Sequence, residues 1–229
     1  MAPGTTTIHH QEAFMLDDYP PLEARVWGDF ACFTRPEMKV ERVSYPVPTP
    51  SAARGILEAI FWRPQFKWRI QQIRVLNPIR YVSILRNEVN AKASYRSASN
   101  WEGQEGHFFA PQNRAQRHTL ALREVDYVIR ARIELQPGVD DHPAKYRDQF
   151  RRRVRDGRCF SRPYLGCREF AARFAEPSGH EQPIHRSDDI GRMLYDLDYR
   201  DDGRGVPYFF QGRLEEGVLH VPAPPWKGA

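Results

Sequence analysis

The sequence predicts an α+β fold, because strand and helix patterns alternate over most of its length and strand patterns return near its C-terminus. Up to residue 177 the order is strand, helix, one or two strands, helix, strand. This is the order of a split βαβ unit, which predicts a ferredoxin-like or RRM-like N-terminal domain. The later hairpin pattern predicts a small β-rich C-terminal domain. The 229 residues suffice for one large domain or two small ones.

The first strand is predicted at residues 21–34. There the apolar residues Leu22, Ala24 and Val26 alternate with Glu23, Arg25 and Trp27, the pattern of a half-buried strand. Gly28 in this strand indicates a bulge or a close approach of another segment.

The first helix is predicted at residues 49–62, where apolar pairs recur every four residues and form one face. Thr49 is suited to the N-cap and Pro50 to the first helical position. Pro64 ends the pattern.

The middle of the chain predicts strands on both sides of a polar segment. Residues 66–89 are rich in Ile, Val and aromatic residues and predict one long strand, or two strands interrupted at Asn77-Pro78. Residues 90–113 predict a loop or hairpin. A strand then follows at about 119–135 and stops at Pro137-Gly138.

A second helix is predicted at residues 142–160, where Tyr146, Phe150 and Val154 are spaced by four and Gly157 is a candidate for the C-terminal cap. Residues 162–174 then predict a return to strand. The last pattern, "VPYFFQGRLEEGVLHVP", predicts a hairpin with its turn near Glu215–Gly217.

These elements divide the chain into three parts. Residues 1–20 are expected to form a loosely held N-terminal extension. Residues 21–177 are expected to form the RRM-like domain, and residues 178–229 the small β-rich domain, because an acidic segment punctuated by Pro and Gly begins at 178.

The charge is concentrated in the middle of the chain. The net charge is +5, but residues 54–100 contain nine Lys or Arg against two Asp or Glu, and residues 112–175 contain fifteen against eight. Most of these cations are arginines, whose planar guanidinium suits phosphate groups. A polyanionic partner is therefore favoured over an ordinary solvated surface, although both interpretations fit the charge count.

Several classes of protein are not supported by the sequence. No apolar run approaches the roughly 18 to 20 residues of a membrane span, and the N-terminus has no secretory signal, so we expect no membrane association. The three cysteines form no CxxC pair, which predicts neither disulfides nor a zinc site and fits a cytoplasmic protein. Walker A, GxSxG and HExxH motifs are absent. We expect no metal and no cofactor.

The stretch "QNRAQRHTLAL" contains the first candidate site. Arg114 and Arg117 precede His118, and Arg123 follows it at the start of the predicted strand. An imidazole can accept or donate a proton near neutral pH, and a neighbouring guanidinium can stabilise the charge of a pentacoordinate phosphate. At a strand entrance Arg117 and His118 could reach one phosphate. The alternative is a surface histidine with no chemical role.

Tyr45 is the second candidate, because it precedes Pro46 and the predicted helix N-terminus, where an anion is favoured. Its hydroxyl could orient a ribose 2′-hydroxyl or exchange a proton with it. The alternative is a tyrosine that packs the loop.

Further contacts to RNA are expected from a base-stacking aromatic residue and a basic helix. Trp27 on the first strand could stack on a base, unless it belongs to the core. Arginines on the second helix could contact phosphates, unless they form a solvated face. These are Arg151, Arg152, Arg153 and Arg155.

Three ordered blocks of sequence then resemble a known family. "WGDFACFTRPEMKVERVSYPVPTPSAARGILEAIFW", "NRAQRHTLALREVDYVIRARIEL" and "RPYLGCREFAARF" are together similar to the CRISPR-associated Cas-five family of the RAMP superfamily, in the d (Dvulg) subtype of type I-C systems. The resemblance covers most of residues 21–175. It implies an RRM-like N-terminal domain and a small β-rich C-terminal domain.

The resemblance also implies an activity. Members of this subtype cut the CRISPR repeat RNA and stay on the 5′ handle of the guide RNA in the surveillance complex. Their catalytic trio is a tyrosine before the first helix, a lysine and the histidine after it. Tyr45 and His118 match this pattern, and Arg117 stands at the lysine position. Arginine keeps the positive charge but is not a plausible proton donor, so Arg117 is expected to stabilise charge.

The expected function is metal-independent endoribonuclease action on precursor RNA, in which the 2′-hydroxyl attacks the adjacent phosphate and leaves a 2′,3′-cyclic phosphate. The expected partners are the CRISPR repeat RNA and crRNA and the other subunits of the type I-C surveillance complex. Non-specific binding of double-stranded DNA is also expected. Two alternatives stay open, a non-catalytic subunit that binds crRNA and an unrelated nucleic-acid-binding module.

Overall fold

The computed structural model describes residues 19–38, 40–89, 114–199 and 205–224, together with the single residues 99 and 111. Within these ranges the chain forms nine strands and two helices. The elements in chain order are β1 (Leu22–Ala31), β2 (Arg42–Val43), α1 (Pro50–Ile60), β3 (Phe66–Val75), β4 (Tyr81–Val89), β5 (Arg114–Leu135), α3 (Pro143–Arg155), β6 (Arg173–Ala175), β7 (Asp188–Tyr199), β8 (Gly205–Glu215) and β9 (Val218–His220).

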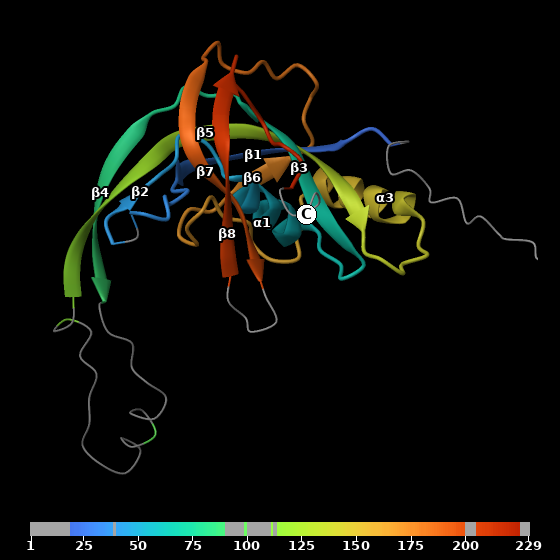
Figure 1. Cartoon of the computed structure of the whole chain (residues 1–229), viewed down its shortest axis with the longest axis horizontal. Helices are drawn as coiled ribbons and strands as arrows, with labels where there is room; N and C mark the ends of the chain where they lie inside the picture. The colour runs from blue at the N-terminus through green and yellow to red at the C-terminus, as the bar shows by residue number, and fades with distance from the viewer. Residues whose placement is uncertain are drawn as a thin grey trace, which may run out of the picture.

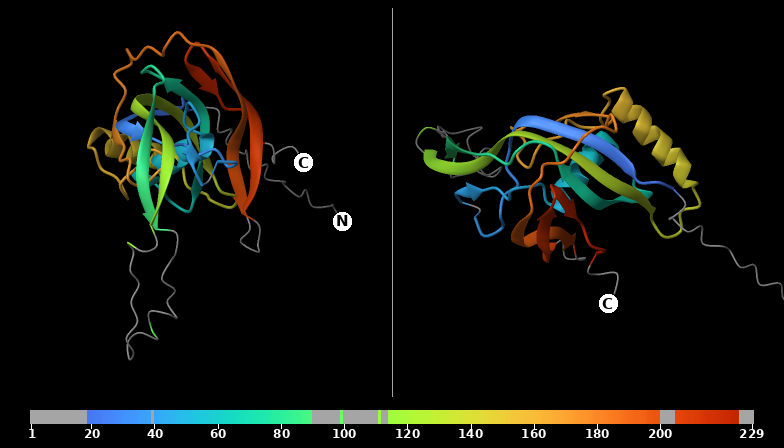
Figure 2. Two further views of the ribbon diagram at one scale, coloured as in Figure 1. Left: turned by 90° about the vertical axis from the view of Figure 1, so that its left-hand side faces the viewer. Right: turned by 90° about the horizontal axis from the view of Figure 1, so that it is seen from above.

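The described strands form one curled sheet around the long strand β5 (Figure 1). The strand order is β6-β1-β5-β3-β9-β8-β7, and β2 and β4 pair with the first part of β5. The described pairings are antiparallel except that of β2 with β5. β4 and residues 114–122 of β5 extend away from the rest of the sheet, and we call them the β4–β5 arm (Figures 1 and 2).

The side-chain alternation along β5 changes phase where the arm begins. Leu122 and Val125 both lie in the main hydrophobic core although they are three residues apart. Glu124 between them has a left-handed backbone (φ 53°), which an L-residue seldom adopts. Within the arm, even-numbered residues of β5 therefore share the face of Leu122, and odd-numbered residues share the opposite face.

Helix α1 covers the inner face of the sheet. The Thr49 side chain accepts a hydrogen bond from the amide of Ala52 and so caps the helix, as its sequence predicts. Ile56, Leu57 and Ile60 are buried in the main core. Burial of each such side chain stabilises the fold by about 1.5 to 3 kcal/mol.

Helix α3 packs at the end of the sheet opposite the β4–β5 arm (Figure 2). Tyr146, Phe150 and Val154 form its buried stripe, and the Phe150 ring lies 4.6 Å from the Trp68 ring, measured between centroids. Gly157 follows the helix with a φ of 64°, so it is the left-handed residue that ends it, as the sequence predicts.

The C-terminal strands continue the same sheet. β7 and β8 form a long hairpin, and β9 joins it to β3. The hairpin is tied to α1 by Arg54, whose guanidinium donates two hydrogen bonds of 2.9 Å to the Asp196 carboxylate. Such bidentate pairs fix orientation as well as adding energy.

Most predicted elements are confirmed. The structure contains both predicted helices, the first strand, and two strands on either side of Asn77-Pro78. The turn of the last hairpin lies at Glu216 and Gly217, as predicted. The predicted loop or hairpin at 90–113 and nearly all of the extension at 1–20 lie outside the described residues.

Two expectations about elements are wrong. Residues 162–174 are not one strand, because residues 162–172 fold into a loop that contributes one bridge, between Tyr164 and Ala171, and the strand is limited to the short β6, which contains Arg173 and Phe174. Gly166 in this loop has a φ of 84°, which interrupts an extended chain. Strand β7 was not predicted, because its acidic residues and Gly191 are typical of loops.

Candidate functional site

His118 lies on an exposed face of the β4–β5 arm. It is opposite Leu85 of β4, and its Nδ1 atom lies 3.4 Å from the hydroxyl of Ser83. Strand β5 begins at Arg114, four residues before His118, so the histidine is within a strand and not at a strand entrance. Its imidazole is exposed to solvent and to any ligand that covers this face of the arm.

Arg117 lies on the opposite face of the arm, because neighbouring residues of a strand alternate. Its Nε atom is 3.7 Å from a carboxylate oxygen of Glu88. Glu88 also contacts Arg42 and Arg86, at 3.3 and 2.7 Å, and both of these arginines contact Glu169. Arg117 is therefore one of several cations around two carboxylates.

Tyr45 shares the face of His118. The Val43–Leu120 pair of the parallel β2–β5 ladder puts Val43 on the even-numbered face of β5, and Tyr45 follows Val43 by two residues. Tyr45 and His118 are thus four residues apart along the ladder, about 13 Å at the rise of an extended chain. The register brings them to one face without direct contact.

The Tyr45 side chain is buried in the main core, and its hydroxyl donates a hydrogen bond of 3.3 Å to the Arg192 carbonyl on β7. Burial raises the pKa of this hydroxyl, against the opposing effect of nearby positive charge. The phenol therefore stays protonated well above neutral pH and can donate a proton or a hydrogen bond. The Arg35 guanidinium lies 4.5 Å from the Tyr45 ring centroid.

The remaining predicted RNA-binding arginines occupy two separate regions. Arg114 and Arg123 are exposed on β5. The arginines of α3 are at the far end of the sheet from the arm (Figure 1), and of these Arg153 is half-buried, with its guanidinium 5.5 Å from the Phe61 ring. Arg151, Arg152 and Arg155 are exposed. The structure does not bring this helix to His118.

Trp27 is half-buried on β1, and the Arg25 guanidinium lies 5.6 Å from its ring. The more exposed aromatic residue of β1 is Phe30, 39 % exposed, which pairs with Arg123 of β5. Phe30 is exposed because the alternation of side chains between the two faces of the sheet shifts near Glu124, and no sequence pattern indicates this shift.

Arg35 and Arg42 are two cations near the site that the sequence analysis did not single out. Both lie in or beside the proline-rich segment between β1 and α1, which carried no periodic pattern. The backbone amide of Arg35 donates to the carbonyl of Val43 within this segment, and the amide of Ser44 donates to the carbonyl of Leu120 and so holds the segment against the arm.

Other site classes receive no support from the described part of the chain. No group of three or more His, Cys, Asp or Glu residues there is arranged to hold a metal ion. No described helix is long and apolar enough to cross a membrane.

The fold and the site together define a mostly β protein with two described helices and an exposed histidine on a projecting arm among arginines. The model of the Cas5d family, described as CRISPR-associated protein (Cas5), matches residues 21–222. The chain belongs to this family.

Relatives and solved structures agree with this assignment. The chain is 43 % identical over 219 residues to a Thermus thermophilus protein named CRISPR pre-crRNA endoribonuclease Cas5d, across 88 % of this chain and 91 % of the relative. A Mannheimia succiniciproducens protein of the same name is 42 % identical over 215 residues, across 88 % of this chain and 94 % of the relative.

Two solved structures share the fold. A crystal structure of a CRISPR-associated protein superimposes with a TM-score of 0.64 at 23 % identity, over 89 % of this chain and 92 % of that chain. A functionally uncharacterized protein from Streptococcus mutans gives a TM-score of 0.63 at 22 % identity with the same coverage.

Proposed function

We propose that this protein is an endoribonuclease that cuts CRISPR precursor RNA within its repeats. Two relatives that are 43 and 42 % identical over most of the chain are named for this activity. The observation in this structure that carries the proposal is the exposed His118 on the same face of the arm as Tyr45. An imidazole accessible to an RNA backbone is what proton transfer in this reaction requires.

The proposed reaction is an attack of a ribose 2′-hydroxyl on the adjacent phosphate. His118 takes the proton of the 2′-hydroxyl as the new P–O bond forms. The bond to the 5′-oxygen then breaks, and that oxygen takes a proton from water or from the His118 imidazolium, which returns to its neutral form. The products are a 2′,3′-cyclic phosphate and a 5′-hydroxyl. Burial raises the pKa of Tyr45, so its hydroxyl stays protonated. Tyr45 therefore serves as a hydrogen-bond donor and not as a base.

Arg117 is proposed to stabilise the extra negative charge on the phosphate. It faces away from His118, but β2 pairs with β5 at Thr119 and Leu120 alone. At Arg117 strand β5 therefore pairs with β4 on one side, and no strand among the described residues pairs with its other edge. In this proposal the Arg117 guanidinium leaves Glu88 of β4 and reaches around the unpaired edge of β5 to a phosphate held beside His118.

Further parts of the proposal come from the family resemblance. After cleavage the protein stays on the 5′ handle of the guide RNA as a cytoplasmic subunit of the type I-C surveillance complex, and it also binds double-stranded DNA non-specifically. The RRM-like domain at 21–177 and the small β-rich domain at 178–229 are proposed as its two parts.

The alternative is a subunit that binds guide RNA without cutting it. The burial of Tyr45 and the hydrogen bond from its hydroxyl to Arg192 favour this alternative, because they direct the phenol toward β7.

Incubation with the repeat RNA of its own array, in EDTA, distinguishes the two functions. We expect cleavage of the RNA and none of a matched RNA with 2′-deoxyribose at the cut nucleotide. His118→Ala should lose about 10²- to 10⁴-fold in rate and keep its RNA affinity. His185→Ala, which removes a histidine that is 95 % exposed in its side chain, is the matched control. Cleavage of the deoxy RNA would exclude the mechanism, and failure of the wild-type protein to cut would leave the binding function.

A further inference from the structure

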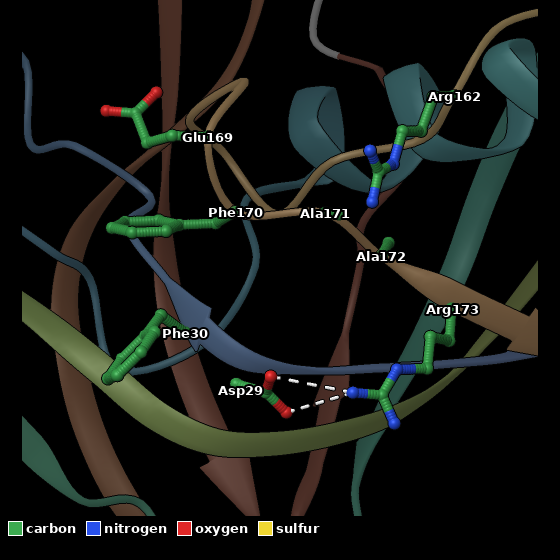
Figure 3. Close-up of a pocket in the computed structure, with 8 residues that line it drawn as sticks. All are labelled: Asp29, Phe30, Arg162, Glu169, Phe170, Ala171, Ala172 and Arg173. Carbon is green, nitrogen blue, oxygen red and sulfur yellow. Dashed lines mark hydrogen bonds and ion pairs between the residues drawn. The ribbon is translucent and has the colours of Figure 1, made fainter.

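A hollow of about 230 Å³ lies between the end of β1 and the loop that precedes β6 (Figure 3). We propose that it is a subsite for one unpaired nucleotide of the RNA, with the base against Phe30 and Phe170 and the phosphate on Arg162 and Arg173. This inference rests on the proposed function and adds a contact outside the residues of the cleavage site.

One wall of the hollow is aromatic. The Phe30 and Phe170 rings lie together on one side, with centroids 5.9 Å apart and planes tilted by 45° (Figure 3). This spacing leaves no gap for a base between the rings, so a base would stack on the open surface of Phe30, which is 39 % exposed. Stacking on an aromatic ring is the usual way in which unpaired RNA bases are held.

The facing wall carries two guanidiniums, those of Arg162 and Arg173 (Figure 3). No described residue forms a hydrogen bond or ion pair with the Arg162 side chain. Arg173 contacts Asp29 at 3.2 Å, but both side chains are more than 60 % exposed. Exposed pairs of this kind contribute little stability, so Arg173 can exchange the carboxylate for a phosphate at little cost.

Two carboxylates also line the hollow, and both already have cationic partners. Asp29 faces Arg173, whereas Glu169 is paired with Arg86 and Arg42 on the side of the arm. The guanidinium of Arg162 thus has no described counter-charge, which favours an anionic ligand on this wall.

The hollow is built before any ligand arrives. Gly28 permits the loop to approach β1, because a Cβ atom there would lie 2.6 Å from Leu165 Cδ1 and 2.9 Å from the Ala171 carbonyl oxygen. Backbone hydrogen bonds from Leu165 to Phe170 and from Ala172 to Pro163 fix the loop itself. A preformed site loses little entropy when it binds.

The position of the hollow connects it to the proposed cleavage site. Phe30 pairs with Arg123, which is five residues from His118 along β5, or about 16 Å. Phe170 packs against the buried cluster that contains Ala121, on the face of the arm that carries Arg117. The volume is below the roughly 300 Å³ of pockets that enclose a whole ligand. It therefore suits a single nucleotide of a chain that continues across the surface.

The test compares binding of the 2′-deoxy repeat RNA, which is not cut, by the full-length protein and four variants. Phe30→Ala should weaken binding about 5- to 100-fold without changing its salt dependence. Arg162→Ala should reduce the slope of log K against log salt by about 0.7. Phe160→Ala and Arg213→Ala remove an exposed phenylalanine and an exposed arginine that do not line the hollow and should change neither quantity.

Ultraviolet crosslinking locates the contact directly. We expect a nucleotide adduct on Phe30 or Phe170 and its loss in Phe30→Ala. If both hollow variants bind like the wild type, the subsite is refuted while the proposed function stands. If the wild-type protein neither binds nor cuts the repeat RNA, the proposed function fails first.

Discussion

Replacing Gly166 with alanine should destabilise the protein by about 3 kcal/mol or more. The backbone of Gly166 is left-handed (φ 84°), which costs an L-residue roughly 1 to 2 kcal/mol. A Cβ atom would also lie 2.0 Å from the carbonyl oxygen of Cys32, and neither backbone can yield without moving the loop. That movement breaks the 3.0 Å hydrogen bond from the Cys32 amide to the Leu165 carbonyl, worth about 1 kcal/mol. It also opens the packing of Cys167.

Gly138→Ala separates the two contributions. Gly138 has nearly the same backbone angle (φ 79°), but an added Cβ atom would meet no other atom within 4 Å. This variant should lose about 1 kcal/mol, the conformational cost alone. Urea unfolding of both variants measures the difference, provided that the slope of free energy against urea is unchanged. Equal losses in the two variants would refute the close approach of Gly166 to Cys32.

Three further outcomes test the charged groups. Arg117→Ala should slow cleavage about 10- to 100-fold, whereas Arg117→Lys should keep most of the rate if charge is what matters; equal losses would contradict that role. Arg54→Ala should cost about 2 kcal/mol in thermal unfolding, because it leaves Asp196 without its bidentate partner. Burial opposes the ionised form of Glu181, but amide hydrogen bonds from Ser178 and elsewhere lower its pKa to about 2, below the usual 4.5. Its stabilisation is therefore complete above about pH 4.5 and lost as the pH falls toward 2, and Glu181→Gln should be less stable than the wild type at pH 7 and approach it near pH 2 in urea unfolding.

Sequence patterns predicted the elements whose stability is local. Helix α1 combines a capping threonine at Thr49, a proline at the first position and one apolar face, and these signals agree with one another. The loop at 162–172 is predicted as a strand because its apolar and polar residues mimic alternation, while the decisive constraint is the close approach of Gly166 to Cys32, which directly follows β1. A contact between segments that are distant in the sequence produces no periodic pattern, so sequence periodicity does not predict it.

In the candidate site, too, residue type could be predicted from the sequence, whereas the relative orientation of the residues could not. His118 is predicted from its residue type and its neighbours, and in the structure it is exposed on the arm. Its relation to Arg117 was predicted from a strand that starts at about 119, whereas β5 starts at Arg114. Residues 114–118 are therefore part of the strand and not of a loop. In a loop the side chains of Arg117 and His118 could converge, whereas in a strand adjacent side chains lie on opposite faces.

The proposed cleavage site and the proposed subsite lie on two faces of the arm, and this arrangement constrains the path of an RNA that uses both. His118 and Tyr45 lie on one face, and Arg117 and the Phe30 hollow lie toward the other. An RNA that uses both sets must cross the edge of β5 near Arg117, beyond the end of the β2 ladder. In the proposed mechanism the group that crosses this edge is the backbone, which would put a phosphate between the guanidinium and the imidazole while the neighbouring bases turn to either side. A single strand can make this turn because its bases are unstacked, whereas a continuous duplex cannot.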